Sequence, residues 1–276
     1  MVTSADPSSR PSRPTLVVLI PVHQNQTGLN KSLHNLRTTQ GEFDVIVVDD
    51  GSMPAVAAPE ALRPNTHVTV LRLPQNRGIT DALNHGVDFA IRAGYSYIAR
   101  LDSADTVVPH RFVAQLALLE SNPCCALVSS FVDFVDADGN FIFRHTTPVN
   151  HTQIVRELRV RNCLLHTSVM IRVSAIRAVG FYDRDFLLAE DYELFVRLSR
   201  SFQVAAVPES LTFTVYDENG LSLRHRRDQI LSRLRVQTRY IKGHRGHVIW
   251  GVVRTLIALV LPQRIVIRWK RAWAQS

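Results

Sequence analysis

Two carboxylates, Asp102 and Asp105, follow an apolar run at residues 95–99, and their types and spacing point to chemistry. The apolar run has the length of a buried strand, and carboxylates at the end of a buried strand are costly unless a positive charge lies beside them. Carboxylate oxygens are also natural ligands for Mg²⁺ or Mn²⁺ bridging to a diphosphate. One interpretation is therefore a metal–diphosphate site. The other is that Asp102 caps a turn and Asp105 caps a helix that begins near Pro109.

A second acidic pair, Glu190 and Asp191, stands at the start of a predicted helix. Leu194, Phe195 and Leu198 recur at helical spacing and are expected to face inward. Acidic residues at a helix start are favoured by the helix dipole and by capping. This explanation accounts for either carboxylate without catalysis.

The elements that must position these side chains are alternating strands and helices. Continuous β-branched and apolar runs are typical of strands that are covered on both faces. Strand, helix and strand in repetition predict a parallel sheet with right-handed crossovers, and ligands bind such sheets at the carboxyl ends of the strands. We predict strands at 16–20, 44–48, 67–73 and 95–99, and helices at 30–39 and 79–92.

The second half of the chain has a less regular pattern. Phe112, Leu116 and Leu119 predict a helix that ends near residue 122. Asp138 and Gly139 lie between two apolar runs and predict a hairpin. We predict further strands at 126–135, 141–143, 166–171, 203–207 and 211–216.

Composition excludes several classes of protein. A chain of 276 residues with 46% hydrophobic residues can bury a large core. Its three cysteines, Cys124, Cys125 and Cys163, cannot form a disulfide framework and lack metal-site spacing, so a reducing compartment is expected. No Gly-x-Gly-x-x-Gly or phosphate-binding Gly-Lys-Ser/Thr loop follows the first strand, which disfavours dinucleotide dehydrogenases and P-loop NTPases.

Charge divides the chain into three parts: a disordered leader at 1–14, an α/β domain at 15–220 and a basic helical tail at 221–276. The tail holds thirteen Lys and Arg residues and one acid, Asp228, so it carries +12, whereas residues 1–220 carry −4 of the net charge of +8. Apolar residues and two tryptophans alternate with these cations, which suits a helix lying on an anionic membrane surface. The alternative is a helical hairpin packed on the domain or on a dimer partner. The apolar stretch at 248–261 is too short to span a bilayer.

Four short motifs together resemble family 2 glycosyltransferases with the GT-A fold, a Rossmann-like and mostly parallel sheet with helices on both faces. They are Ile-Pro-Val-His at 20–23, Val-Val-Asp-Asp-Gly-Ser at 47–52, Asn-Arg-Gly at 76–78 with Asn84 downstream, and Arg-Leu-Asp-Ser-Ala-Asp at 100–105. Their order and spacing match over about residues 15–215. The resemblance implies a nucleotide-diphosphate-sugar donor, a divalent metal, Mg²⁺ or Mn²⁺, and inversion at the anomeric carbon.

The resemblance also implies roles for individual residues. Pro21 and Val22 line the base pocket, and Asp50 hydrogen-bonds the base. His166 lies near the donor phosphates; the alternative is a structural core or loop histidine that is hydrogen-bonded within the protein. Asp191, in the acceptor-side motif that begins at Gly180, is the catalytic base. The implied donor-site residues are Pro21, Val22, Asp50, Gly51, Asn76, Arg77, Gly78, Asn84, Arg100, Asp102 and His166.

One position departs from the family pattern. The common form of the metal motif is Asp-x-Asp-Asp, and its third residue is the usual direct metal ligand. Here that residue is Ala104, which has no ligand atom. We therefore assign the metal to Asp105, with Asp102 on the metal or on the ribose.

These observations predict a hexosyl- or deoxyhexosyltransferase that moves a sugar from a UDP- or dTDP-sugar to a hydroxyl of a glycan or lipid-linked acceptor. The resemblance and the tail suggest surface polysaccharide or lipopolysaccharide synthesis, in the cytoplasm and peripheral on the inner face of the membrane. The alternative is a degenerate relative that binds only nucleotide or membrane, and Ala104 is its best support. Nucleic-acid binding is disfavoured because the cluster of arginines at 224–239 lacks interleaved aromatic residues.

Overall fold

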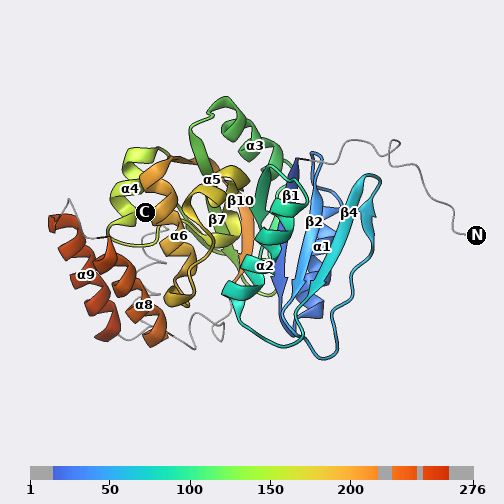
Figure 1. Ribbon diagram of the computed structural model, residues 1–276, viewed down its shortest axis with the longest axis horizontal. Helices are drawn as coiled ribbons and strands as arrows, with labels where there is room; N and C mark the ends of the chain where they lie inside the picture. The colour runs from blue at the N-terminus through green and yellow to red at the C-terminus, as the bar shows by residue number, and fades with distance from the viewer. Residues whose placement is uncertain (1–14, 217–225, 241–244, 261–276) are drawn as a thin grey trace, which may run out of the picture.

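Ten strands form one sheet that runs through the molecule (Figure 1). The computed structural model describes residues 15–216, 226–240 and 245–260. The strand order is β3-β4-β2-β1-β5-β9-β7-β10-β6, and β8 pairs with β7 at the side. The strands are β1 Leu16–Val22, β2 Asp44–Asp49, β3 Ala61–Arg63, β4 Thr66–Arg72, β5 Tyr97–Arg100, β6 Thr106–Val107, β7 Cys125–Val135, β8 Phe141–His145, β9 Met170–Arg172 and β10 Gln203–Val215.

Helices cover both faces of the sheet, as predicted for an α/β fold. Alternate residues of β1 enter two different cores: Val17 and Leu19 pack under α2, α5 and α6, whereas Val18 and Ile20 pack under α1 and α3. This explains why β1 and β2 are continuous apolar runs, since a strand covered on both faces has no polar side. The helices are α1 Gln26–Leu36, α2 Ile79–Arg92, α3 Arg111–Ser121, α4 His151–Leu158, α5 Val173–Val179, α6 Glu190–Ser201, α8 Arg226–Arg239 and α9 Arg245–Val260.

The sheet is parallel in its first half and mixed in its second. β1 pairs in parallel with β2 and with β5, and β2 pairs in parallel with β4. β9 then runs antiparallel to both β5 and β7, while β10 pairs in parallel with β7. The predicted hairpin around Gly139 is confirmed as the antiparallel pair β7–β8.

Two local predictions in this half are wrong. The predicted strand at 166–171 is instead a turn of 3₁₀ helix, η2 (His166–Ser168), followed by β9. The two predicted strands at 203–207 and 211–216 are one strand, β10, because register shifts near Val207 and Ser210 absorb the irregular residues without ending the pairing with β7.

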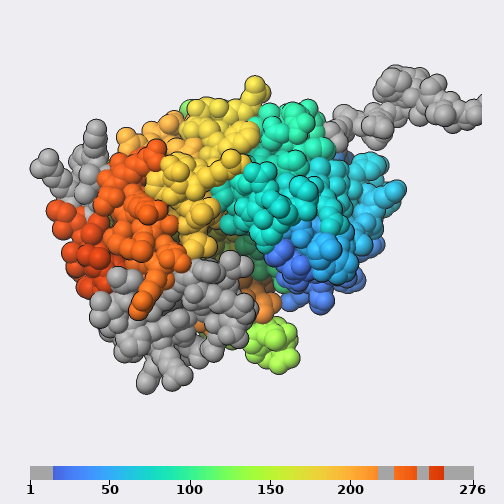
Figure 2. All heavy atoms as spheres, turned by 60° about the horizontal axis from the view of Figure 1, so that its bottom comes forward, coloured from blue at the N-terminus to red at the C-terminus, as the bar shows by residue number. Residues whose placement is uncertain are grey.

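The C-terminal helices α8 and α9 lie side by side at the end of the molecule opposite β4 (Figures 1 and 2). Helix α8 is anchored on the α/β domain: Gln237 Nε2 donates to the carbonyl of Val160 over 2.7 Å, and the Tyr240 hydroxyl donates to Glu193 over 2.5 Å. Gly251 of α9 packs so closely on the Val160 backbone that a β-carbon there would lie 2.8 Å from its Cα. The predicted domain boundary near residue 220 and the predicted leader at 1–14 fall outside the described residues.

Candidate active site

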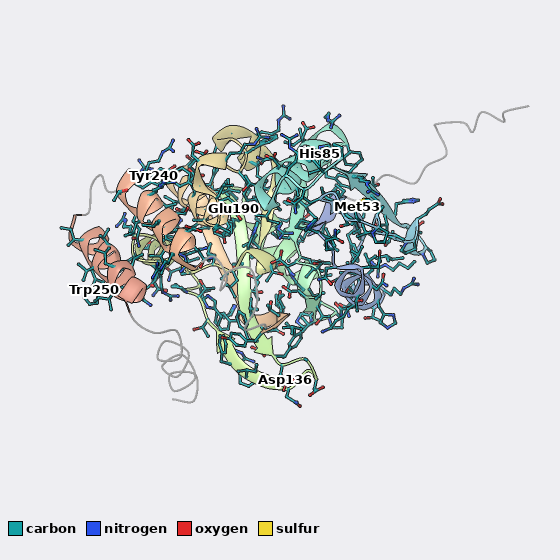
Figure 3. The ribbon with its side chains drawn as sticks, turned by 90° about the horizontal axis from the view of Figure 1, so that it is seen from below. Met53, His85, Asp136, Glu190, Tyr240 and Trp250 are labelled. Carbon is teal, nitrogen blue, oxygen red and sulfur yellow. The ribbon has the colours of Figure 1, made fainter. Side chains whose placement is uncertain are left out.

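The polar residues predicted at the strand ends come together at one edge of the sheet. Val22 at the end of β1 is in register with Asp49 at the end of β2, and β5 ends on the other side of β1 at Arg100. The three strands are neighbours and run in the same direction, so their following loops share this edge. Figure 3 views the molecule from that side.

Asp50 ties the loop after β2 to the loop after β4. Its two carboxylate oxygens accept hydrogen bonds from the backbone N–H groups of Arg77, over 2.7 Å, and Gly78, over 2.9 Å. Gly51 has a φ of +68°, and a β-carbon there would lie 2.3 Å from the carbonyl carbon of Gln75. Only glycine fits so close to this loop. Asp50, Gly51 and residues 76–78 therefore form one group at this edge of the sheet.

Of the other predicted donor-site residues, Pro21 and Val22 adjoin this group, whereas Asn84 lies elsewhere. Pro21 and Val22 are buried at the end of β1, and the following His23 bonds the carbonyl of Asp50 through Nδ1 over 2.8 Å. Asn84 lies in α2 and does not join them. Its side chain exchanges two hydrogen bonds of 2.9 Å with the backbone of Tyr182, so it positions the segment that precedes α6.

Arg100 is turned into the protein. It is completely buried, and its guanidinium donates to the carbonyls of Leu19, over 2.8 Å, and Leu101, over 3.0 Å. It also donates to Oδ1 of Asp102 and, through Nε, to Nε2 of His166 over 3.3 Å. This arginine is the positive charge that a carboxylate at the end of a buried strand requires.

The loop at 102–105 has a strained centre. Ala104 has a φ of +83°, which is uncommon for a residue with a side chain. Its N–H group donates to the carbonyl of Gly28 and to the Ser32 hydroxyl, both over 3.0 Å, and these bonds hold the strained residue against α1. Asp105 does not cap α3, whose N-cap is His110.

The two acidic residues of this loop are in different environments. The Asp102 side chain is 48% exposed, whereas Asp105 is only 4% exposed and accepts a hydrogen bond from the Thr214 hydroxyl. Burial and the charge of Asp102 raise the pKa of Asp105 to about 7. The described residues contain no group of three or more His, Cys, Asp or Glu side chains able to hold a metal ion. Two carboxylates nevertheless fit Mg²⁺, which usually keeps several waters and uses substrate phosphate oxygens as further ligands.

Asp191 lies in the first turn of α6. Its Oδ2 accepts from Asn162 Nδ2 over 3.0 Å, and its Oδ1 accepts from the N–H group of Tyr192 over 2.6 Å. Burial raises the pKa of Asp191 above its usual value. The charge of Asp102 also raises it, and Arg233 of α8 opposes the rise. Asp102 and Asp191 are about ninety positions apart in the sequence, but the fold brings them close enough to influence each other.

Glu190, the neighbour of Asp191, is a buried acid to which sequence reasoning assigned no role beyond helix capping. It is 7% exposed, and its Oε2 is buried without a hydrogen-bond partner among the described residues. Burial and the neighbouring Asp191 raise its pKa to about 7. In Figure 3 Glu190 lies toward the middle of the molecule. Its position beside Asp191 was the available signal, but helix capping explained it equally well.

His166 and Tyr182 are linked to Asp102 through Arg100. His166 Nε2 is 2.8 Å from the Tyr182 hydroxyl and also accepts from Arg100. Burial and the charge of Arg100 hold the pKa of His166 well below its usual range, so the ring is neutral and acts as an acceptor at Nε2. Tyr182 is a second residue that the sequence analysis did not select.

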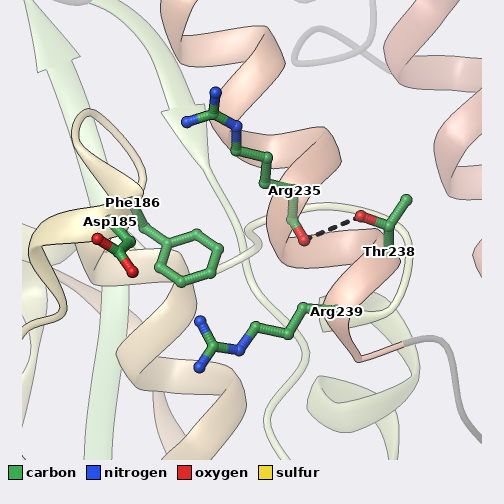
Figure 4. Close-up of a pocket in the computed structure, with 5 residues that line it drawn as sticks. All are labelled: Asp185, Phe186, Arg235, Thr238 and Arg239. Carbon is green, nitrogen blue, oxygen red and sulfur yellow. Dashed lines mark hydrogen bonds between the residues drawn. The ribbon is translucent and has the colours of Figure 1, made fainter.

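A hollow of about 500 Å³ lies between α8 and the 3₁₀ turn η3 (Arg184–Phe186), apart from the strand ends (Figure 4). The Phe186 ring lies between the guanidinium groups of Arg235 and Arg239 in that view. The residues that line it are Asp185, Phe186, Arg235, Thr238 and Arg239. Because η3 leads directly into α6, the hollow adjoins the segment that carries Asp191.

Comparison with known proteins shows the family. The sequence profile of the family "Glycosyl transferase family 2" matches residues 17–180. The amylovoran biosynthesis glycosyltransferase AmsE of Erwinia amylovora is 28% identical over 250 residues, which are 86% of this chain and 88% of that protein.

Solved structures show the same fold. The structure of S. aureus TarS 1–349 with UDP-GlcNAc superposes with a TM-score of 0.63 at 15% identity, over 87% of this chain and 71% of that one. The mannosyltransferase PcManGT from Pyrobaculum calidifontis, with GDP-Man and Mn²⁺, superposes with a TM-score of 0.60 at 14% identity, over 95% of this chain and 74% of that one. The family match, the sheet and the strand-end site together lead to one conclusion: the chain is a family 2 glycosyltransferase with the GT-A fold.

Proposed function

We propose that this enzyme transfers a hexose or deoxyhexose from UDP or dTDP to a hydroxyl of a glycan or lipid-linked acceptor, with inversion at the anomeric carbon. The observation that carries the proposal is the approach of two acidic loops, with Asp102 on one side and Asp191 on the other. An inverting transfer needs a base on one face of the sugar and charge stabilisation for the leaving diphosphate on the opposite face. Two acidic loops whose charges influence each other are suited to supply both.

Asp191 is the residue we propose as the general base. An acceptor hydroxyl is a poor nucleophile at neutral pH, and a carboxylate that accepts its proton as the new bond forms accelerates attack by roughly 10²–10⁴-fold. The Asn162 amide and the Tyr192 N–H group hold the Asp191 carboxylate in a fixed orientation. Glu190 lies beside it as a buried second acid.

Asp102 and Asp105 are the residues we propose for the divalent metal. When bound, Mg²⁺ or Mn²⁺ would stabilise the charge that gathers on the leaving diphosphate. The half-exposed carboxylate of Asp102 can reach a ligand without rearrangement, and its second oxygen accepts no hydrogen bond from the described residues. The burial of Asp105 makes it the less accessible of the pair. This difference favours Asp102 as the direct ligand, with Asp105 behind it.

The nucleoside is proposed to lie over the ends of β1 and β2, against Pro21, Val22 and Asp50. The Asp50 carboxylate already bonds the backbone at residues 77–78, so it can organise this loop as well as contact a base. The TarS structure contains UDP-GlcNAc and the PcManGT structure contains GDP-Man, which supports a nucleotide-sugar donor for this fold. The relationship to AmsE supports a role in the synthesis of a surface polysaccharide or lipopolysaccharide.

Helix α9 is the proposed contact with an anionic membrane surface on the cytoplasmic side. Five large apolar side chains of α9 are exposed, and their spacing places them on one face of the helix. They are Ile249, Trp250, Val253, Leu256 and Ile257. None of the described helices is long and apolar enough to cross a membrane. The basic segment at 261–276, which is part of the same prediction, lies outside the described residues.

The test is a thermal-shift panel of UDP, dTDP, GDP and CDP, each with Mn²⁺ and with EDTA, followed by transfer assays with the nucleotide-sugars of the hits. A ligand at about 100 times its dissociation constant adds roughly 2.7 kcal/mol to the free energy of unfolding. A metal-dependent shift with UDP or dTDP, followed by transfer to a lipid-linked glycan, is the expected result. Nucleotide binding without any transfer would favour the degenerate, binding-only alternative.

A further inference from the structure

The buried guanidinium of Arg100 connects the two acidic loops of the site. On the donor side it donates to Oδ1 of Asp102, and on the other side its Nε donates to His166. Arg111 fixes the same residue from behind, because its Nη2 donates to the carbonyl of Arg100 over 2.9 Å. A planar guanidinium with this many partners has a defined orientation.

His166 continues the connection to the acceptor side. Arg100 Nε can only donate, so Nε2 of His166 must be the acceptor, and the Tyr182 hydroxyl donates to the same nitrogen over 2.8 Å. Burial raises the pKa of the Tyr182 hydroxyl, which keeps it a neutral donor. One ring nitrogen is thus shared by a residue of each loop.

Tyr182 is itself fixed to the acceptor-side segment. It is 4% exposed, and Asn84 bonds both its N–H and its carbonyl group over 2.9 Å. Asp183, the next residue, pairs with Arg239 of α8 over 3.4 Å. Tyr182 therefore has a fixed place in the segment that leads to Glu190 and Asp191.

We propose that Arg100, His166 and Tyr182 form a positioning network that couples the donor-side loop at 102–105 to the acceptor-side segment at 180–191. The proposal rests on the proposed function, in which Asp102 serves the donor and Asp191 serves the acceptor. Arg100 and Tyr182 are positioning residues because both are buried and act through their neighbours. Buried polar networks hold their members in one arrangement. Two loops that act on opposite faces of the anomeric carbon need such a fixed arrangement.

Tyr182→Phe is the sharpest probe, because it removes one hydroxyl and keeps the ring. Tyr95→Phe is a matched control: Tyr95 is also 4% exposed, and its hydroxyl donates to Asp44 over 2.7 Å on another part of the sheet. We expect Tyr182→Phe to lower transfer turnover by about 10–100-fold, the range for residues that orient contacting side chains, while the dissociation constant of the nucleotide measured in EDTA, which does not depend on the metal-binding loop, stays unchanged. Tyr95→Phe should leave both quantities unchanged.

Hydrogen exchange tests the coupling without any turnover. In Tyr182→Phe we expect faster amide exchange at residues 101–105, on the donor-side loop, and no such change in Tyr95→Phe. Unchanged exchange there would refute the network even if the enzyme transfers sugar as proposed. Conversely, faster exchange in a protein that transfers no sugar would support the network and count against the proposed function alone.

A double-mutant cycle provides the last check. His166→Leu removes the shared acceptor nitrogen and leaves no hydrogen-bonding atom in its place, so Tyr182→Phe added to it should cost no further turnover. If the two losses multiply instead, Tyr182 does not act through His166 and the proposal is wrong.

Discussion

The hydroxyl of Thr214 donates a hydrogen bond of 2.9 Å to Oδ2 of Asp105, although the two residues are 109 positions apart. The short strand β6 makes this possible, because its Thr106 pairs with Phe213 of β10. A buried carboxylate that would serve a metal is thus held by a neutral hydroxyl. Burial and the charge of Asp102 then dominate, and the pKa of Asp105 rises to about 7.

The raised pKa of Asp105 predicts a pH-dependent stability in the absence of metal. A carboxyl that binds its proton more tightly in the folded state than in the unfolded state loses stability as pH rises from its ordinary pKa of 3.8 to about 7. Within that window each pH unit costs up to about 1.4 kcal/mol per group. In EDTA, the free energy of unfolding measured with denaturant should therefore be lower at about pH 8 than at about pH 5.

Asp105→Asn should reduce this pH dependence, because asparagine does not titrate. Glu190, whose pKa is also raised to about 7, should account for a remaining slope of the same sign. The same dependence in Asp105→Asn as in the natural chain would mean that Asp105 is ionised throughout.

Asp191→Asn should fold and bind nucleotide but lose about 10²–10⁴-fold in transfer turnover, because an amide cannot accept the proton of the acceptor hydroxyl. Asp88→Asn is a matched control on α2, where the Asp88 side chain is 46% exposed and pairs with Arg92. Retained turnover in Asp191→Asn would remove this residue as the base.

The pH profile of turnover gives an independent test of the same residue. The base acts as a carboxylate, and burial raises the pKa of Asp191 above the ordinary 3.8. Turnover should therefore fall on acidification, at a pH higher than an exposed aspartate would give. A profile that stays flat down to the ordinary range of aspartate would contradict this assignment.

Asp102→Asn and Asp105→Asn should both weaken nucleotide binding in Mn²⁺, and Asp102→Asn should weaken it more. The physical reason is access, since the Asp102 side chain is 48% exposed and Asp105 is 4% exposed. Titration calorimetry with UDP in Mn²⁺, repeated in EDTA, separates the metal-dependent part of the affinity. If neither substitution changes that part, the metal does not bind at this loop.

Trp250→Glu should reduce sedimentation with anionic vesicles, because it places a negative charge on the exposed apolar face of α9. Phe141→Glu is a matched control on β8, with 57% exposure compared with 59% for Trp250. Equal sedimentation of both variants with the natural chain would exclude α9 as the membrane contact. Loss of sedimentation in both would indicate a general effect of charge.

Local pattern was sufficient for much of the fold. The helix predicted at 79–92 matches α2, and the apolar runs at 16–20 and 44–48 lie within β1 and β2. These elements are predictable because burial on one helix face, or on both strand faces, leaves a periodic or continuous apolar signal. The polar residues at three strand ends could also be placed at one edge, because parallel strands end together.

The second half of the sheet did not follow from pattern. His166 stands in a 3₁₀ turn, and β10 continues through residues that looked like a break. In β10 the pairing with β7, which depends on the rest of the sheet, overrides local preference.

By itself, the sequence determined the fold class, the edge of the sheet that carries the site and the two acidic loops, because strand periodicity and the order of motifs are local properties. The tertiary structure alone decided that Arg100 points inward, that Asn84 holds Tyr182, that Asp105 is buried and that the Glu190 carboxylate is buried with one oxygen unbonded among the described residues. The direction of a polar side chain depends on which distant partners remove its cost of burial, and packing alone brings those partners together.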